Sequence, residues 1–423
     1  MIKVFKLKKY KFCDLYQIGS GISSSKENAG KGYPFASFST VFNNFFLPDE
    51  LPDLMDTTAK QREASSIKNG DILVTRTSET IGELAMSSVA LKDYPNATFS
   101  GFVKRLRPIK TNIVYPKYIA FYLRSPYFRK LINVKTTMTL RASFNEAIFS
   151  TLDLYLPSYE MQKNIGDFLY SIEQKISINN QINDNLQQLI QSVYSYWFNQ
   201  FNFPNSNGIP YASNNGIMVY NESIKRKIPE DWKVETLRHN SLSNFIETGI
   251  PYFESKNYLA TANVNNSMIK DGEWVTYSNR ESRANMAPSI YSIWFAKMKN
   301  SVKHMAIPKN GEWMVEKYIF STGFAGIQCN KNSFAYLYCL INEPFFENIK
   351  DILSHGATQQ SVNNDDLDSI KIVVPPSEIL VSFAEFANPL YEKICNIIRE
   401  NQILCQQRDS LLPLLINGQI TID

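Results

Sequence analysis

The side chains in this sequence that could bind a charged partner are cations gathered in short clusters. Residues 104–110 and 280–304 each hold several Lys and Arg, and residues 1–11 hold five Lys without an acid. The formal net charge of the 423-residue chain is only +4. Whole-chain charge therefore permits a nucleic-acid partner without requiring one. Each cluster is typical either of a phosphate-binding surface or of an ordinary solvated face.

Residues suited to catalysis, or to holding a metal or cofactor, are hard to find. The three histidines, His239, His304 and His355, have no second ligand at a metal-binding spacing. Gly19-Ser-Gly21 lacks the third glycine of a dinucleotide loop, and Asn28–Gly32 lacks the Ser or Thr of a phosphate-binding loop. There is also no Asn-Pro-Pro-aromatic motif of the kind with which adenine methyltransferases hold a flipped base. The sequence predicts a protein that recognises a partner and does not react with it, without a metal or cofactor of its own.

Cysteine usage and hydropathy indicate a cytoplasmic protein with no membrane partner. No stretch of this chain approaches the 18 or so continuous apolar residues of a membrane helix. The lysine-rich start is not followed by the apolar segment of a secretion signal. The five cysteines are odd in number and show no CxxC pairing, which favours reduced thiols: Cys13, Cys329, Cys339, Cys395 and Cys405.

The elements that would position the cations occur twice in the chain. Residues 118–128 are echoed by 336–346, and the apolar strand at 152–157 is echoed by 370–375. On the N-terminal side of Gly101 in the first copy and of Gly323 in the second, the two sequences no longer match clearly. A constant offset indicates duplication of a whole domain with the helix that follows it. The landmarks of the two helices recur 218 residues apart: Phe168 and Phe386, Lys175 and Lys393, Leu186 and Leu404.

Each copy ends in a long segment with a heptad pattern. At about 1.5 Å per residue, some 35 residues form a rod of roughly 50 Å, which is more than a small domain covers. We therefore expect the two helices to pair as an antiparallel coiled coil, with Pro389 kinking or restarting the second one. The alternative is that each helix packs only on its own domain. The predicted interface residues are Ile165, Phe168, Ile172, Ile182, Leu186, Leu189 and Val193 in the first helix, and Phe386, Leu390, Ile397, Leu404 and Leu411 in the second.

Together these features resemble the specificity subunit of type I DNA restriction-modification enzymes along nearly the whole chain. In one respect the chain departs from that pattern: the strand at 70–76 is not clearly repeated, and residues 291–299 fill its place. The matching motifs are Gly70–Arg76 with Ile81-Gly82, Glu160-Met-Gln162, Ile178–Asn183, Tyr194–Phe198, Ile228–Trp232, Gln407–Pro413 and Asn417-Gly-Gln419.

The resemblance implies an α+β protein with a pseudo-two-fold internal repeat. Two globular α/β-type target recognition domains would be separated by two long helices that form an antiparallel coiled coil. The implied segments are recognition domain 1 at 1–156, spacer helix 1 at 157–200, a linker at 201–228, recognition domain 2 at 229–374, spacer helix 2 at 375–416 and a tail at 417–423.

The resemblance also implies a non-catalytic function in DNA methylation and phage defence. Each recognition domain would read one half of a bipartite double-stranded DNA target, and the helices would set the spacer and dock two methyltransferase subunits. S-adenosylmethionine would bind to those subunits and not to this chain, and motor-nuclease subunits are a further partner that the resemblance allows. One alternative is a coiled-coil scaffold that binds proteins rather than DNA. Another, a self-contained methyltransferase or nuclease, lacks the catalytic motifs.

Under this interpretation the cations acquire specific roles. Base edges are read by side chains in the grooves, while Lys and Arg neutralise the surrounding phosphates. Arg76, Arg141 and Arg283 are the candidate base readers, and the lysines are expected to hold phosphate. The predicted DNA-binding residues are Arg76, Lys104, Arg105, Arg107 and Arg141 in the first domain, and Arg283, Lys297, Lys299, Lys303 and His304 in the second.

Overall fold

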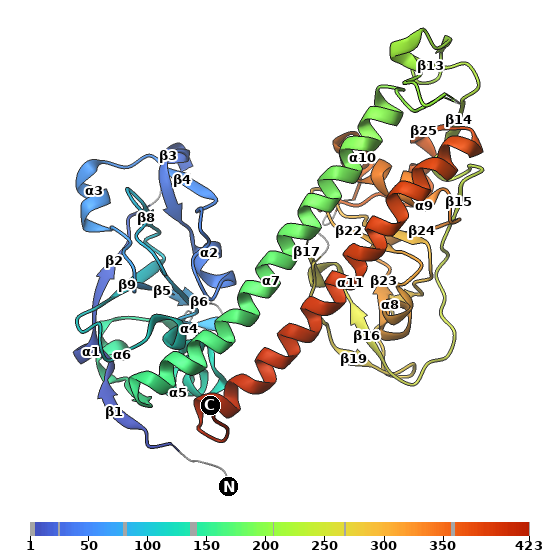
Figure 1. Ribbon diagram of the computed structural model, residues 1–423. Coiled ribbons are helices and arrows are strands. Elements are labelled where there is room, and N and C mark those ends of the chain that lie inside the picture. The colour runs from blue at the N-terminus through green and yellow to red at the C-terminus, as the bar shows by residue number, and fades with distance from the viewer. Residues whose placement is uncertain are drawn as a thin grey trace. The chain divides into compact units, whose positions relative to one another are not determined.

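The protein, seen in a computed structural model, is built from two compact units. The structure describes residues 5–23, 26–78, 83–135, 142–205, 207–265, 268–356 and 360–422. Unit 1 comprises residues 1–177 with 403–423, and unit 2 comprises residues 178–402. Both units combine helices and strands, so the fold class is α+β, as predicted (Figure 1). Two long helices, α7 (Tyr159–Tyr194) and α11 (Ser377–Ile416), contribute a part to each unit.

Unit 1 is built around a four-stranded antiparallel sheet in the order β2-β9-β5-β7 and a three-stranded sheet in the order β4-β3-β8. The pair β1–β11 leads the chain into the long helix. Its elements before α7 are β1 (Lys8–Lys11), α1 (Phe12–Leu15), β2 (Tyr16–Ser20), η1 (Lys26–Asn28), β3 (Ala29–Ala36), α2 (Phe38–Asn43), β4 (Asp53–Met55), α3 (Ala59–Ala64), β5 (Ile72–Thr75), β6 (Thr77–Ser78), β7 (Ser87–Val89), β8 (Thr98–Phe99), β9 (Val103–Pro108), α4 (Pro116–Arg124), α5 (Pro126–Lys135), β10 (Ala142–Ser143), α6 (Glu146–Thr151) and β11 (Asp153–Leu156).

The core of unit 1 forms where helix α4 covers the four-stranded sheet. Strand β5, Ile72-Leu-Val-Thr75, is buried along its length, as expected of a central strand that is covered on both faces. Short helices are fixed by local caps: Thr58 and Gln61 form a reciprocal capping box at the start of α3. Leu169 from α7 and Leu415 from α11 complete the same core. Unit 1 therefore closes only with the help of both long helices.

Unit 2 contains two four-stranded sheets, in the orders β15-β24-β21-β22 and β19-β16-β23-β20. Tyr194 of α7 and Phe383 of α11 belong to its main core, together with residues of α9. Its elements after α7 are η3 (Ser195–Asn199), η4 (Ala212–Asn214), β12 (Met218–Asn221), β13 (Arg226–Pro229), β14 (Lys233–Thr236), β15 (Ser243–Phe245), β16 (Lys256–Leu259), η5 (Thr261–Asn263), β17 (Val264–Asn265), β18 (Met268–Ile269), β19 (Trp274–Val275), β20 (Ala284–Met286), β21 (Ser292–Ala296), β22 (His304–Ile307), α8 (Glu312–Lys317), β23 (Tyr318–Ser321), β24 (Phe324–Cys329), α9 (Phe334–Ile341), α10 (Pro344–Leu353), η6 (Asp366–Ser369) and β25 (Lys371–Val374).

The two units share one strand arrangement, including the front parts whose sequences diverge. In unit 1, Thr75 of β5 pairs with Val103 of β9. In unit 2, Ala296 of β21 pairs with Phe324 of β24. Each residue of the second pair lies 221 positions after its counterpart in the first pair. Strand β21 therefore fills the place of β5, as the sequence predicted for residues 291–299. The parallel pair β3–β8 has its counterpart in β16–β23. Duplication thus extends into the front part of each unit.

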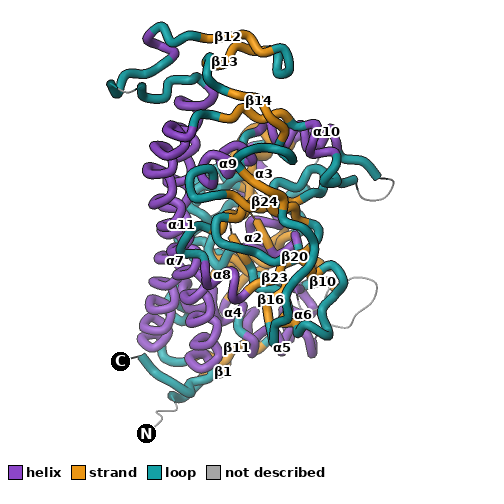
Figure 2. The backbone as a smooth tube through the Cα atoms, turned by 90° about the vertical axis from the view of Figure 1, so that its right-hand side faces the viewer, coloured by secondary structure: helices purple, strands orange, loops and turns teal. Residues whose placement is uncertain are grey.

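Within unit 2, α7 and α11 lie side by side (Figure 2). They run in opposite directions, because a later residue of α7 meets an earlier residue of α11. Asn179 donates from Nδ2 to Glu400 Oε2 over 2.8 Å, and the ring of Tyr194 lies 6.2 Å from that of Phe383. Within unit 1, Glu173 of α7 pairs with Arg408 of α11. The buried Asn179 meets a carboxylate, so this part of the contact is polar.

The predicted heptad register is wrong for two residues of α7. Phe168 and Leu189 are 38% and 48% exposed, whereas the neighbouring Leu169 and Ile190 are fully buried. A helix turns by about 100° per residue, so adjacent apolar positions lie on different faces. Of the other predicted interface residues, Ile165 and Ile397 are buried, and Ile172, Ile182, Leu186, Val193, Phe386, Leu390, Leu404 and Leu411 are half-buried.

Two further expectations need correction. Helix α11 is continuous through Pro389, which is exposed near its start and does not restart it. The segment 201–228 is folded rather than a plain linker, because it carries strand β12 and most of β13. Phe203 within this segment is buried and stacks on Trp232 with ring centroids 5.2 Å apart.

Candidate nucleic-acid interface

The duplicated fold places one predicted cation from each unit at the same position. Arg76 follows β5, and its backbone N–H donates to Phe102 O over 2.7 Å. Lys297 follows β21, and its N–H donates to Gly323 O over 2.9 Å. A second bond closes each arrangement: Phe144 N–H donates to Arg76 O over 2.7 Å, and Val362 N–H donates to Lys297 O over 3.0 Å.

The turn beside each cation is also held in the same way. Phe102 N–H donates to Ser100 Oγ over 3.2 Å, and Gly323 N–H donates to Ser321 Oγ over 3.1 Å. These paired bonds define two equivalent surface sites, which we call tip 1 and tip 2. Tip 1 comprises Arg76 and residues 100–102, and tip 2 comprises Arg283, Lys297 and residues 321–323.

The tips share a backbone but present different side chains. Phe102 in tip 1 is 58% exposed, whereas tip 2 has Gly323 at the equivalent position. A Cβ built on Gly323 would lie 3.6 Å from Arg283 Nη2, so the guanidinium occupies the space beside the glycine. Arg283 enters this site from the segment before β20, and its carbonyl accepts from Thr322 N–H over 2.8 Å. Its side chain is exposed.

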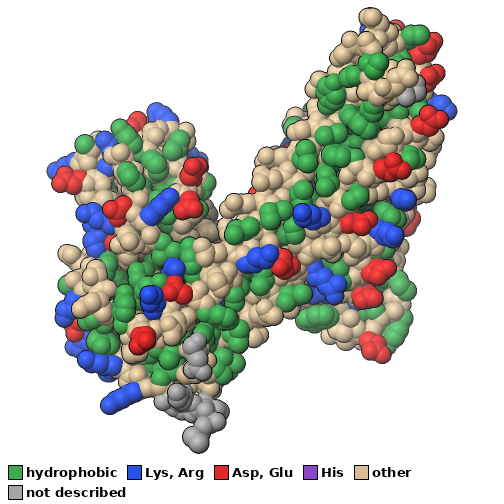
Figure 3. Space-filling model, viewed as in Figure 1, with side chains coloured by type: hydrophobic (Ala, Val, Ile, Leu, Met, Phe, Trp, Pro, Cys, Tyr) green, Lys and Arg blue, Asp and Glu red, His purple; other side chains and the backbone are tan. Residues whose placement is uncertain are grey.

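Tip 2 concentrates positive charge. Burial lowers the pKa of Lys297, and the neighbouring Arg283 lowers it further. Within the described ranges, neither these two side chains nor Arg76 forms an ion pair with a carboxylate. Adjacent cations without an acid repel one another, and a bound anion relieves that repulsion. On the visible face of each unit, Lys and Arg alternate with Asp and Glu and form no extended basic surface (Figure 3).

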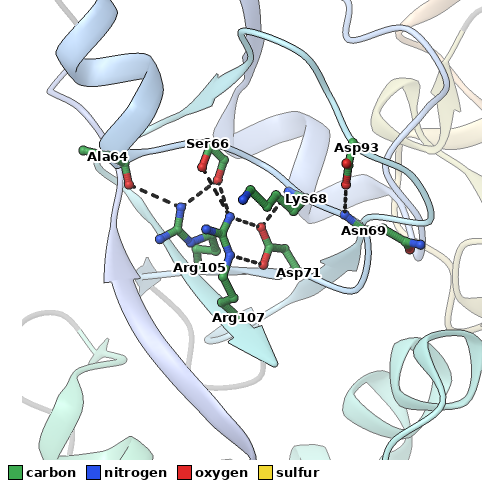
Figure 4. Close-up of polar contacts among 8 residues, drawn as sticks. All are labelled: Ala64, Ser66, Lys68, Asn69, Asp71, Asp93, Arg105 and Arg107. Carbon is green, nitrogen blue, oxygen red and sulfur yellow. Dashed lines mark hydrogen bonds and ion pairs between the residues drawn. The ribbon is translucent and has the colours of Figure 1, made fainter. Parts of the chain in front are cut away.

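Arg105 and Arg107 are engaged inside unit 1. Both reach Ser66 O, through Arg105 Nη1 at 2.6 Å and Arg107 Nη2 at 2.9 Å (Figure 4). Arg107 also makes a bidentate pair with the fully buried Asp71, at 2.9 and 2.7 Å, and these bonds raise the pKa of its guanidinium. Burial lowers the pKa of Arg105. Their geometry favours the positioning of the segment before β5 over direct contact with a partner.

The remaining predicted lysines lie near the tips. Lys104 Nζ donates to Ser20 Oγ over 2.7 Å, and Lys303 Nζ donates to the carbonyl of Thr261. Lys299 is half-exposed in the turn between β21 and β22. Each of these side chains retains contact with solvent, so a phosphate contact stays a prediction for all three. Arg141, a predicted base reader, lies outside the described residues.

His304 lies inside unit 2, contrary to its predicted role. Only 6% of the residue is exposed. Its Nε2 lies 2.8 Å from Glu347 Oε1 and its Nδ1 lies 3.0 Å from Asn342 Oδ1. Because the side chain is enclosed by these partners, we assign it to the core and not to a DNA-binding surface. In the sequence His304 directly follows the cluster Lys297–Lys303, but in the fold it is the first residue of the buried strand β22.

One tip residue was missed in the sequence. The sequence comparison set Gly101 opposite Gly323, at the edge of the matching region, but the backbone bonds make Phe102 the counterpart of Gly323. The comparison of the copies was therefore one residue out of register at this point. The backbone bonds that make them equivalent are visible only in the fold. An apolar residue between Ser100-Gly101 and the basic strand β9 was the available hint.

The described ranges contain neither a metal-binding cluster nor a membrane-spanning helix. No group of three or more His, Cys, Asp or Glu side chains there could hold a metal ion. No helix in the same ranges has the length and apolarity needed to cross a membrane.

Comparison with known proteins points to one family. Residues 6–188 match the model of a family described as "Type I restriction modification DNA specificity domain". The chain is 22% identical over 449 residues to the "Type I restriction enzyme HindI specificity subunit" of Haemophilus influenzae, covering 93% of this chain and 95% of that protein. It is 24% identical over 399 residues to the MjaIX specificity subunit of Methanocaldococcus jannaschii, covering 83% and 84%. The crystal structure of a type I restriction-modification S subunit from M. genitalium shares the fold, with a TM-score of 0.52, 14% identity and coverage of 100% and 97%.

Proposed function

Since this chain is related along nearly its whole length to the specificity subunits of type I restriction-modification systems, we propose that it selects the DNA sequence on which such a complex acts. Each unit reads one half of a bipartite double-stranded target. The chain itself carries out no reaction. Methyl transfer to adenine, with S-adenosylmethionine as donor, belongs to two partner methyltransferase subunits, and motor-nuclease subunits are further partners of the complex.

The observation that carries this proposal is the pair of equivalent tips. Two copies of one fold hold a cation at the same backbone position, Arg76 and Lys297, and surround it with different side chains. Phosphate contacts recur wherever DNA is bound, whereas base contacts must differ between different sequences. A shared cation with divergent neighbours is what two readers of two different half-sites require.

The long helices provide the second part of the proposal. They pair as an antiparallel coiled coil, act as a spacer between the half-sites and offer docking surfaces to the methyltransferase subunits. Their opposed direction within unit 2 and the contact of Glu173 with Arg408 within unit 1 support this arrangement. The exposed apolar side chains Phe168 and Leu189 are available on α7 for such docking.

The proposal is tested by sequencing modified DNA. A host lacking methylation receives the methyltransferase subunit with this chain, without it, or with a variant in which Arg76 and Lys297 are both Ala. We expect methylated adenine in one bipartite motif only when the intact chain is present, and greatly reduced modification with the variant. The purified chain alone should transfer no methyl group. Motif-specific methylation without this chain would contradict the proposal, and so would methyl transfer by the isolated chain.

A further inference from the structure

Tip 1 and tip 2 differ in the chemical character of the side chain that stands beside the shared cation. We propose that Phe102 and Arg283 are the specificity-determining residues of the two tips, with Phe102 contacting the methyl group of a thymine in one half-site and Arg283 contacting a guanine in the other. This inference rests on the proposed function and adds to it the identity of a base that each unit reads.

Phe102 is poorly explained as part of the folded core. It is 58% exposed in a turn whose backbone is fixed at both sides: its N–H donates to Ser100 Oγ, and its carbonyl accepts from Arg76. Gly101 N–H, one residue earlier, donates to Ile22 O over 2.7 Å. The fixed turn holds an apolar ring outward next to the exposed Arg76. In the major groove, an apolar ring finds a matching partner only in the 5-methyl group of thymine.

Arg283 occupies the corresponding place in unit 2 by a different route. Thr322 N–H donates to Arg283 O over 2.8 Å, which is the counterpart of the bond from Gly101 to Ile22. Gly323, at the position of Phe102, has no side chain, and the Arg283 guanidinium lies beside it, with Nη2 3.6 Å from the place of a Cβ. It has no carboxylate partner within the described ranges and lies close enough to Lys297 to lower the pKa of that lysine. An exposed guanidinium without a carboxylate partner matches the O6 and N7 acceptors of guanine, and Lys297 contacts the adjacent phosphate in this proposal.

The inference predicts separate changes in the two half-sites. In the methyltransferase complex, F102A should relax the preference for one thymine in one half-site and leave the other half-site unchanged. R283A should relax the preference for one guanine in the other half-site. The loss of discrimination at that base should be roughly fivefold or more, because a bidentate contact to guanine discriminates at least that strongly. R283K keeps the positive charge but removes the paired N–H donors of the guanidinium. The complex should therefore retain its affinity for DNA and still lose the guanine preference.

Two matched variants control for general effects. Arg280→Ala removes an arginine from the same segment that lies over the Tyr277 ring, 4.1 Å from its centroid, instead of beside the tip. Phe345→Ala removes an aromatic side chain that is 64% exposed on α10. Both should keep the methylated motif. Circular dichroism of each variant checks that the chain remains folded.

The readout is the sequence motif around methylated adenine, together with binding of the complex to duplexes altered at single bases. If the complex with the unaltered chain methylates no specific motif, the proposed function fails and the inference falls with it. If that complex methylates its motif but F102A, R283A and R283K all keep the same motif, the inference alone is overturned. It is also overturned if Arg280→Ala relaxes the motif as R283A does. An unaltered motif that lacks the combination of a thymine in one half-site and a guanine in the other overturns it as well.

Discussion

At the scale of single residues, unit 2 stabilises itself with a buried charge network around Glu347. His304 Nε2 lies 2.8 Å from one carboxylate oxygen, and Lys350 Nζ lies 2.5 Å from the other. Lys350 is fully buried and also donates to Ser301 O over 3.0 Å. A buried charge is tolerated only when it is paired and hydrogen-bonded. The network ties α10 to the turn and strand that follow Lys297.

We predict that replacing Lys350 with Met destabilises unit 2 by about 3–5 kcal/mol. The substitution leaves the carboxylate of Glu347 without its ammonium partner in a buried site, and breaking such a pair has that typical cost. Denaturant unfolding followed by fluorescence would measure the effect. Lys371→Met on β25 is the control, because Lys371 is exposed. Equal stability of the two variants would show that the network contributes nothing.

The same network predicts a pH dependence. Burial alone would raise the pKa of Glu347, but hydrogen bonds from His304 and Lys350 outweigh burial and lower it below its ordinary value of 4.5. A carboxyl whose pKa is lower when folded adds stability above its unfolded pKa, and loses it as pH falls through the folded pKa. Unfolding at pH 6 and at pH 3 should therefore differ less for E347Q than for the unaltered chain. A steeper dependence in E347Q would contradict this.

Sequence reasoning located the cations but could not sort them by role. Arg107 and Arg76 are both arginines near basic strands, yet Arg107 is held by Asp71, which lies 36 positions earlier. His304 follows Lys303 directly, but Lys303 is half-exposed whereas His304 is buried inside unit 2. Such outcomes depend on long-range contacts, which are not visible in local composition.

At the scale of elements, α7 offers a direct test of its packing register. Leu169 is fully buried and Phe168 is 38% exposed. We predict that L169A lowers the free energy of unfolding by about 2–5 kcal/mol, because it leaves a cavity in the unit 1 core. F168A should cost about 1 kcal/mol or less. Urea denaturation of both variants measures the difference, and a larger loss for F168A would restore the register predicted from the sequence.

The existence and length of each long helix could be predicted, whereas the register could not. Phe168 and Leu169 are both apolar, as are Leu189 and Ile190, so two different heptad registers are compatible with the same amino-acid sequence. Asn179 and Asn183 are buried in α7 although polar, which further weakens the sequence signal. The choice is made by what each face meets, such as Glu400 opposite Asn179.

At the scale of the whole molecule, the duplication was predictable from the sequence wherever the frame is shared. It was hidden in the front parts, where Phe102 matches Gly323 and Arg76 matches Lys297. Backbone hydrogen bonds preserve the arrangement there while the side chains change. Comparison of the two amino-acid sequences detects only shared side chains. It therefore misses the duplication at surfaces where the side chains have diverged.

A change in helix length tests the proposed spacer. Four residues inserted after Ser177 and four after Gln402 lengthen both helices by about 6 Å. A four-residue insertion is tolerated in a coiled coil as a local unwinding. At about 3.4 Å per base pair, the methylated motif should gain one or two unspecified base pairs and keep both half-site sequences. An unchanged spacer with full activity would show that the helices do not set the distance.

Unit 1 depends on residues 403–422 as much as on its own early residues. Leu412, Leu415 and Ile416 are buried in its core, and a Cβ on Gly418 would lie 3.2 Å from the ring of Phe5. Removing residues 403–423 should therefore unfold unit 1 and leave unit 2 intact, since each buried aliphatic side chain contributes about 1.5–3 kcal/mol. Limited proteolysis with mass spectrometry would detect cleavage confined to unit 1, and protection of both units would contradict this prediction.

This dependence has a consequence for biosynthesis. The ribosome makes the first 177 residues of unit 1 early, but the helical segment that seals them emerges only after all of unit 2. Domains generally fold as they are synthesised, the earlier ones first. Here the domain begun first is the one completed last, with apolar surface open to solvent throughout translation. Nascent chains stalled before Ile403 should recruit chaperones through unit 1, and a message truncated there would yield a product marked for degradation.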